Sequence, residues 1–169
     1  MKKRMKGFTL VELIVVIAII GVLAAILVPS MMGYVKSSRL KTANSNAKLV
    51  YTTAATYCAD QETLGKPVDY TGKFSCISAK ADEETPKEGD TTTTKGVQDA
   101  VINALSDNGK AAGEAYLEIK ANSVSNAEWH KQSGDKVIGR YPNPGVEIKG
   151  DAVNGEDGKP ITFKISTTK

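Results

Sequence analysis

The chain has 169 residues, of which 41% are hydrophobic and 24% charged, and its formal net charge is +3 at pH 7. This length allows one modest domain in addition to a membrane segment. The basic residues of positions 1–6 contribute +4 and leave −1 for the rest of the chain. The positive charge therefore belongs to the N-terminus and does not indicate a nucleic-acid-binding surface.

The sequence contains none of the common catalytic signatures. It has no C-x-x-C, H-E-x-x-H, Walker-A or G-x-S-x-G motif. Its one histidine, His130, is expected at the surface or at a strand edge. We therefore expect neither an enzyme nor a bound cofactor.

The first predicted element is an apolar helix that follows residues 1–7. Residues 8–28 are apolar almost throughout, which is typical of a helix surrounded by lipid or by other helices. Glu12 lies near the start of this run, although a charge at the centre of a bilayer costs about 2.5–3.5 kcal/mol. If the chain is cut between Gly7 and Phe8, the new amino group lies one helical turn before Glu12. The two charges could then neutralise each other, within one chain or between neighbouring chains.

Two other interpretations of this N-terminus are open. A secretory signal peptide also begins with basic residues, but it ends in a small-residue cleavage site, and Ala24-Ala25 is followed by Ile, Leu, Val and Pro. An uncleaved anchor is the second alternative, because about 17–25 apolar residues can span a bilayer. Neither accounts for Glu12 or for the Gly7-Phe8 pair.

Residues 6–29 read K-G-F-T-L-V-E-L-I-V-V-I-A-I-I-G-V-L-A-A-I-L-V-P. This stretch resembles the N-terminal class III signal of type IV pilins and of the related type II secretion pseudopilins, and the likeness extends to about residue 60. The resemblance implies that a prepilin peptidase and methyltransferase removes residues 1–7 by cutting after Gly7 and then methylates the amine of Phe8. It also implies that Glu12 pairs with a neighbouring subunit's amine during assembly, and it assigns Pro29 to the same assembly motif.

The resemblance also implies a location and a set of partners. Residues 8–29 would form the transmembrane helix and, after assembly, the filament core. The basic leader would stay in the cytoplasm, as positive charge beside a membrane segment favours, and the head would lie outside. The expected partners are the membrane, further copies of the chain in a helical polymer, the prepilin peptidase, the pilus assembly platform and minor pilins.

Residues 30–64 are predicted to continue the helix as an amphipathic half. Apolar residues recur there at a spacing of three or four, which places them on one helical face; they are Leu40, Ala43, Ala47, Val50, Ala54 and Tyr57. This face is available to a globular head. Pro29 removes a backbone hydrogen bond and should kink the helix between its two halves.

Residues 65–96 are expected to connect the helix to the head. A short strand could form at 73–78, whereas 81–95 has no apolar periodicity and indicates an exposed loop that includes the four threonines 91–94. Cys58 and Cys76 both fall on the outer side of the membrane in this topology. We therefore expect a disulfide between them, which the chain-entropy model values at about 3 kcal/mol. Two buried free thiols are the alternative.

The remaining residues predict a small sheet with one extra helix. The helix is expected at 97–105 and strands at 115–120, 136–141, 146–149 and 161–165. In the first strand Ala115, Leu117 and Ile119 should be buried and the residues between them exposed. Short consecutive strands imply an antiparallel meander with one covered face. The expected fold class is α+β, a long N-terminal helix packed on a small antiparallel β-sheet in the head 65–169, which is the α/β-roll of pilins.

One loop near the C-terminus is rich in oxygen ligands, namely Asp151, Asn154, Glu156 and Asp157. Such loops can bind Ca²⁺, and pseudopilins carry a calcium loop in roughly this part of the head. The spacing does not match an EF-hand, and loops of Gly, Asp and Asn are mostly turns. We therefore expect no metal and keep calcium as the alternative.

The expected function is that of a major pilin, a structural subunit assembled from the membrane into a type IV pilus. The alternatives are a pseudopilin of a type II secretion system, favoured if the 151–158 loop binds calcium, and a minor tip pilin that acts as an adhesin.

Overall fold

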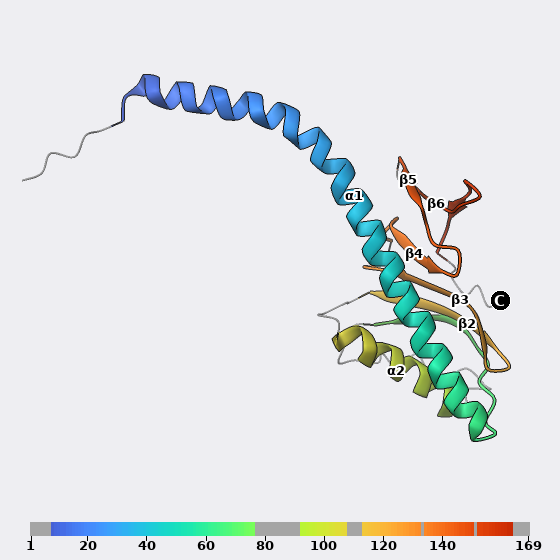
Figure 1. Ribbon diagram of the computed structural model, residues 1–169. Coiled ribbons are helices and arrows are strands. Elements are labelled where there is room, and N and C mark those ends of the chain that lie inside the picture. The colour runs from blue at the N-terminus through green and yellow to red at the C-terminus, as the bar shows by residue number, and fades with distance from the viewer. Residues whose placement is uncertain (1–7, 77–91, 108–112, 133, 151, 164–169) are drawn as a thin grey trace, which may run out of the picture. The chain divides into compact units, whose positions relative to one another are not determined.

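The computed structural model describes residues 8–76, 92–107, 113–132, 134–150 and 152–163 of the chain (Figure 1). The chain divides into two compact units, residues 1–36 and residues 37–169. The first unit holds the beginning of helix α1. The second unit, called the head below, holds the rest of α1, helix α2 and two small sheets.

Helix α1 (Leu10–Thr63) passes through both units and contains Pro29. It ends where Gly65 adopts a positive φ of 68°. The Gly65 N–H donates to Glu62 O at 3.0 Å and the Lys66 N–H donates to Gln61 O at 2.9 Å. This pair of bonds is a Schellman motif, which glycine favours because it has no Cβ to strain in the left-handed region.

One face of α1 is buried in the head, and its members recur at helical spacing: Leu40, Ala43, Asn46, Ala47, Val50, Ala54 and Cys58. This confirms the predicted face, except that Cys58 is buried and Tyr57 only half-buried. Gly139 lets its strand approach α1 closely, because a Cβ at this position would collide with the backbone carbonyl of Ala43.

The larger sheet is antiparallel in the order β1 (Tyr70–Ser75), β2 (Glu114–Lys120), β3 (Ser123–His130) and β4 (Ile138–Tyr141). Helices α1 and α2 (Thr92–Asp107) lie over one face of it (Figure 1). That face supplies Leu117 and Trp129 to the main hydrophobic core, and α2 adds Val97, Val101 and Leu105.

The smaller sheet is antiparallel in the order β5 (Glu147–Lys149), β6 (Ala152–Asn154) and β7 (Pro160–Ile161). Its core is a separate cluster, in which Val153 and Ile161 pack with Leu40 of α1 and Ile138 of β4. Asn44 of α1 holds the connection between the sheets. Its side chain donates to Gly145 O at 2.7 Å and accepts from the N–H groups of Arg140 and Gly145, both at 3.3 Å.

The predicted α+β fold with an antiparallel sheet covered by the long helix is confirmed. The expectation of an exposed loop over 81–95 is wrong at its end, because α2 begins at Thr92. Residues 77–91 lie outside the described part. The expected exposure of Tyr116 is also wrong: it is 5% exposed, because Phe163 from the C-terminal segment packs on it with ring centroids 6.5 Å apart.

Candidate functional site

The start of α1 is organised by a reciprocal pair of side chains, Thr9 and Glu12. Glu12 Oε2 accepts hydrogen bonds from the Thr9 N–H at 2.8 Å and from the Thr9 hydroxyl at 2.7 Å. In return, the Glu12 N–H donates to Thr9 Oγ1 at 3.2 Å. This arrangement is a capping box, which satisfies N–H groups that the first helical turn leaves without intrahelical partners. The carboxylate is therefore fixed at the helix start, one residue from Phe8.

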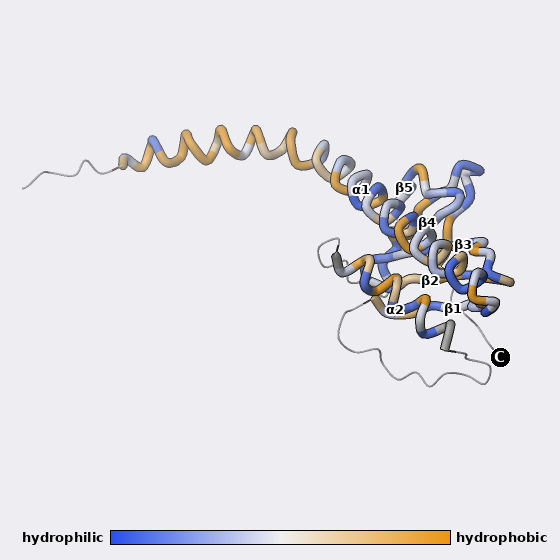
Figure 2. Tube along the Cα trace, turned by 60° about the horizontal axis from the view of Figure 1, so that its bottom comes forward, coloured by the Kyte–Doolittle hydropathy of each residue, from blue (hydrophilic) through white to orange (hydrophobic). Residues whose placement is uncertain are grey.

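The helix that follows this cap is apolar and fully exposed. Every residue from 8 to 39 is exposed, including large side chains such as Leu10, Ile14 and Ile26. Figure 2 shows the apolar colouring along this first part of α1. Among the described residues there is one helix, α1, that is long enough and apolar enough to cross a membrane. An exposed apolar surface of this size requires lipid or other helices around it.

Pro29 lies inside α1, and the helix continues on both sides of it. The neighbouring Ser30 hydroxyl donates to Leu27 O at 2.9 Å, a bond to the helix backbone close to the proline. Gly7, the other predicted processing residue, lies outside the described residues. The structure thus places Phe8, Glu12 and Pro29 on one apolar segment.

The two cysteines are buried members of the main core, Cys58 on α1 and Cys76 directly after β1. Both are free thiols in the structure. Burial raises the pKa of Cys58 to about 11 and that of Cys76 to about 12. The expected disulfide between them is thus not formed in the structure, and it stays a prediction for the protein made by the cell.

Three of the four candidate calcium ligands lie in the described part of the chain. Asp151 lies outside the described residues, and Asn154 is buried in β6. Glu156 and Asp157 are exposed in the turn, where Asp157 Oδ1 accepts the Lys159 N–H at 3.1 Å. Across the described part of the chain, no group of three or more His, Cys, Asp and Glu residues could hold a metal ion. The described members of this loop therefore do not support the calcium alternative.

The N-terminus matches the family model for the prokaryotic N-terminal methylation motif over residues 2–28. The chain is 34% identical over 142 residues to a fimbrial protein of Moraxella nonliquefaciens, covering 73% of this chain and 90% of that protein. The chain belongs to the type IV pilins.

Other pilins match over shorter stretches of the chain. The type IV major pilin protein PilA of Myxococcus xanthus is 39% identical over 59 residues, which is 35% of this chain and 27% of that protein. A type IV major fimbrial protein FimA of Dichelobacter nodosus is 39% identical over 66 residues, 39% of this chain and 42% of that protein. No solved structure matches the chain. These relatives confirm the predicted function of this pilin as a major pilin subunit.

The expectation for His130 was wrong. This residue is 3% exposed at the end of β3, and its Nε2 lies 2.9 Å from Oε2 of Glu114, which is its partner in the β2–β3 register. The ring of Phe163 stacks on the imidazole with centroids 4.0 Å apart. The pilin therefore buries its histidine under a residue distant in sequence, which a local pattern could not indicate.

Sequence reasoning also missed Thr9 as part of the site. Its signal was present, because threonine followed three residues later by glutamate before an apolar run is the pattern of a capping box. In the structure of the pilin the carboxylate already has a partner within its own chain.

Proposed function

We propose that the chain is made as a prepilin, cut between Gly7 and Phe8, methylated on the new amine of Phe8, and then assembled as a major pilin. Residues 1–7 are the leader, and residues 8–29 hold the subunit in the cytoplasmic membrane. The leader stays inside, while residues 30–64 and residues 65–169 lie outside. After assembly the subunit is part of an extracellular pilus.

The observation that carries this proposal is the position of the Glu12 carboxylate. It caps the Thr9 N–H at 2.8 Å, so it lies one residue from the peptide nitrogen that becomes the amine of Phe8 after cleavage. A negative charge at a helix N-terminus is favourable on its own. The new ammonium group of the same chain, or of a neighbour, then supplies the full counter-charge that an apolar environment demands.

Assembly moves the apolar helix from lipid into a bundle of identical helices. The hydrophobic gain of this step is small, because lipid is as apolar as the bundle. Helix packing, the Glu12 pairing and contacts between heads must therefore decide whether a subunit joins. The partners are copies of the same chain, the prepilin peptidase and methyltransferase, the assembly platform and minor pilins. This role is structural and requires no catalytic residue.

The proposal predicts the behaviour of Glu12→Ala. The variant should still lose residues 1–7, because the cut lies at Gly7-Phe8, but it should form no surface fibres. Mass spectrometry of the membrane fraction reports the cut, and shearing of the cells reports the fibres. Glu156→Ala removes an exposed carboxylate of the head and serves as the control, which should form fibres normally. Normal fibres from Glu12→Ala would remove the proposed role of this carboxylate.

A further inference from the structure

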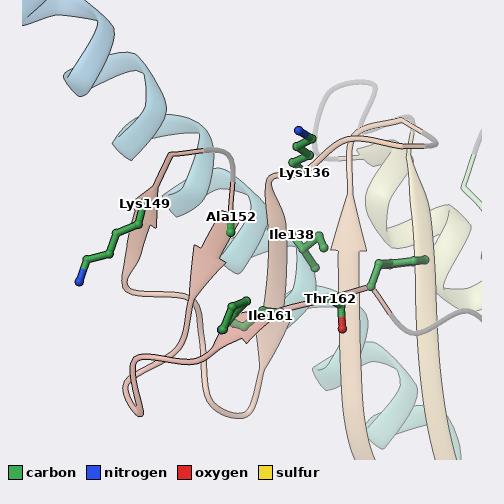
Figure 3. Close-up of a pocket in the computed structure, with 8 residues that line it drawn as sticks. Lys136, Ile138, Lys149, Ala152, Ile161 and Thr162 are labelled. Carbon is green, nitrogen blue, oxygen red and sulfur yellow. The ribbon is translucent and has the colours of Figure 1, made fainter.

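The head carries a groove between its two sheets. Its volume is about 440 Å³, and its apolar walls include Ile138 of β4 together with Ala152 and Ile161 of the smaller sheet (Figure 3). Two lysines, Lys136 and Lys149, are the only charged residues among those that line it. Lys149 Nζ lies 3.3 Å from Glu147 Oε2, but both side chains are more than half exposed, and such a pair contributes little.

The C-terminal end of α1 carries an apolar side chain and negative charges that complement the groove. Leu64, directly after the last helical residue, is 64% exposed. Two exposed carboxylates, Asp60 and Glu62, precede it in the last turn of the helix. We call these three residues the terminal knob. The cation Lys66 follows it and offsets part of its charge. An apolar tip flanked by acids matches an apolar groove flanked by lysines, since complementary charge favours one partner and orientation.

One subunit cannot join its own knob to its own groove. The groove lies over the cluster that contains Leu40, whereas the knob lies at residues 60–64 of the same helix. At 1.5 Å per residue, the two are about 35 Å apart along α1. A second copy of the chain offers the missing partner. A contact between two different patches repeats from copy to copy without closing and builds an open row.

We propose that the terminal knob of one subunit docks in the groove of the next subunit along the pilus. Leu64 fills the apolar floor, while Asp60 and Glu62 meet Lys136 and Lys149. This contact rests on the proposed function as a filament subunit and assigns the head a role in assembly that is independent of Glu12.

Cysteine cross-linking of fibres tests this contact. The double variant Leu64→Cys with Ala152→Cys should give a ladder of covalent multimers when fibres are oxidised, and reduction should remove it. Each single variant should give no ladder beyond dimers. The pair Leu64→Cys with Ser106→Cys is the matched control, since Ser106 is exposed on α2 and does not line the groove. Fibres without a ladder, or an equal ladder from the control pair, would overturn the proposal.

Charge reversal gives a second test that does not depend on introduced thiols. Asp60→Lys with Glu62→Lys, and separately Lys136→Glu with Lys149→Glu, should each lower the fibre yield by about tenfold through like-charge contact. All four changes together should restore the yield. Reversals without effect, or a combination that stays as poor as its parts, would contradict the contact. Absence of fibres from the unmodified chain would instead contradict the proposed function.

Discussion

Two glutamates show how single residues of this pilin carry charge in apolar surroundings. Glu12 stands at the start of an exposed apolar helix and is capped by Thr9. Glu128 on β3 is fully buried, and its Oε1 lies 2.7 Å from Nη2 and 2.9 Å from Nε of Arg140. Asn126 adds a bond to the same oxygen at 3.2 Å. In both places the carboxylate accepts hydrogen bonds from side-chain or backbone donors fixed beside it, as a polar group in apolar surroundings requires.

The buried pair predicts a large effect of Arg140→Met on stability. The change removes one partner of a buried ion pair, which typically costs about 3–5 kcal/mol. Lys159→Met breaks an exposed pair with Asp157, 3.8 Å apart, and should cost less than about 1 kcal/mol. Denaturant unfolding of the full chain, followed by the fluorescence of Trp129, compares the two free energies. Equal losses would show that the buried pair adds nothing.

The elements of the head differ in how well the sequence predicts them. The buried face of α1 was predicted because its apolar residues keep a helical period from Leu40 to Ala54. Strand β3 was missed because it contains Ser123, Asn126 and the buried polar residues Glu128 and His130, which do not alternate with apolar residues in the usual way. These polar side chains are tolerated because β2 and β4 bring Glu114 and Arg140 to them, and this pairing is visible only in three dimensions.

The sequence predicted the residues of the candidate site but not the hydrogen bonds between them. Gly7, Phe8 and Glu12 were predicted from a short motif and from the cost of a charge in an apolar segment, and their roles stay predictions. The bonds between Thr9 and Glu12 could have been predicted from their spacing alone. The groove could not, because its walls come from β4 and from the smaller sheet, and β6 was not predicted at all.

The packing of the helices and β1 predicts the reactivity of the two cysteines. Burial raises the pKa of both thiols from an ordinary value of 9.0 to about 11 and about 12. The unfolded chain therefore loses these protons first, and stability should fall as the pH rises from about 9 towards 11, with the full contribution present below 9. When the protein is first reduced, iodoacetamide at pH 8 should label neither thiol of the folded chain and both thiols in denaturant.

Two other outcomes of this labelling experiment would lead to different conclusions. Rapid labelling of both cysteines in the folded chain would contradict the packing of α1 and β1 in the core. Failure to label either cysteine in denaturant without prior reduction, reversed by a reducing agent, would establish the predicted bridge between Cys58 and Cys76.

At the scale of the whole molecule, the first unit cannot exist alone in water. Its residues 8–36 are exposed throughout and mostly apolar, so lipid or other copies must cover them. The head has its own core and presents a knob and a groove that only another copy can join. Both units of the pilin thus leave surfaces that further copies of the chain can cover, as expected for the subunit of a polymer.

The most direct test is the intact mass, without reduction, of the protein sheared from the cell surface. The account predicts abundant fibres whose subunit begins at Phe8 and carries one methyl group, and the same mass reports whether Cys58 and Cys76 are bridged. A chain that begins beyond Pro29, or one found only in the culture fluid, would contradict it and indicate an ordinary secreted protein.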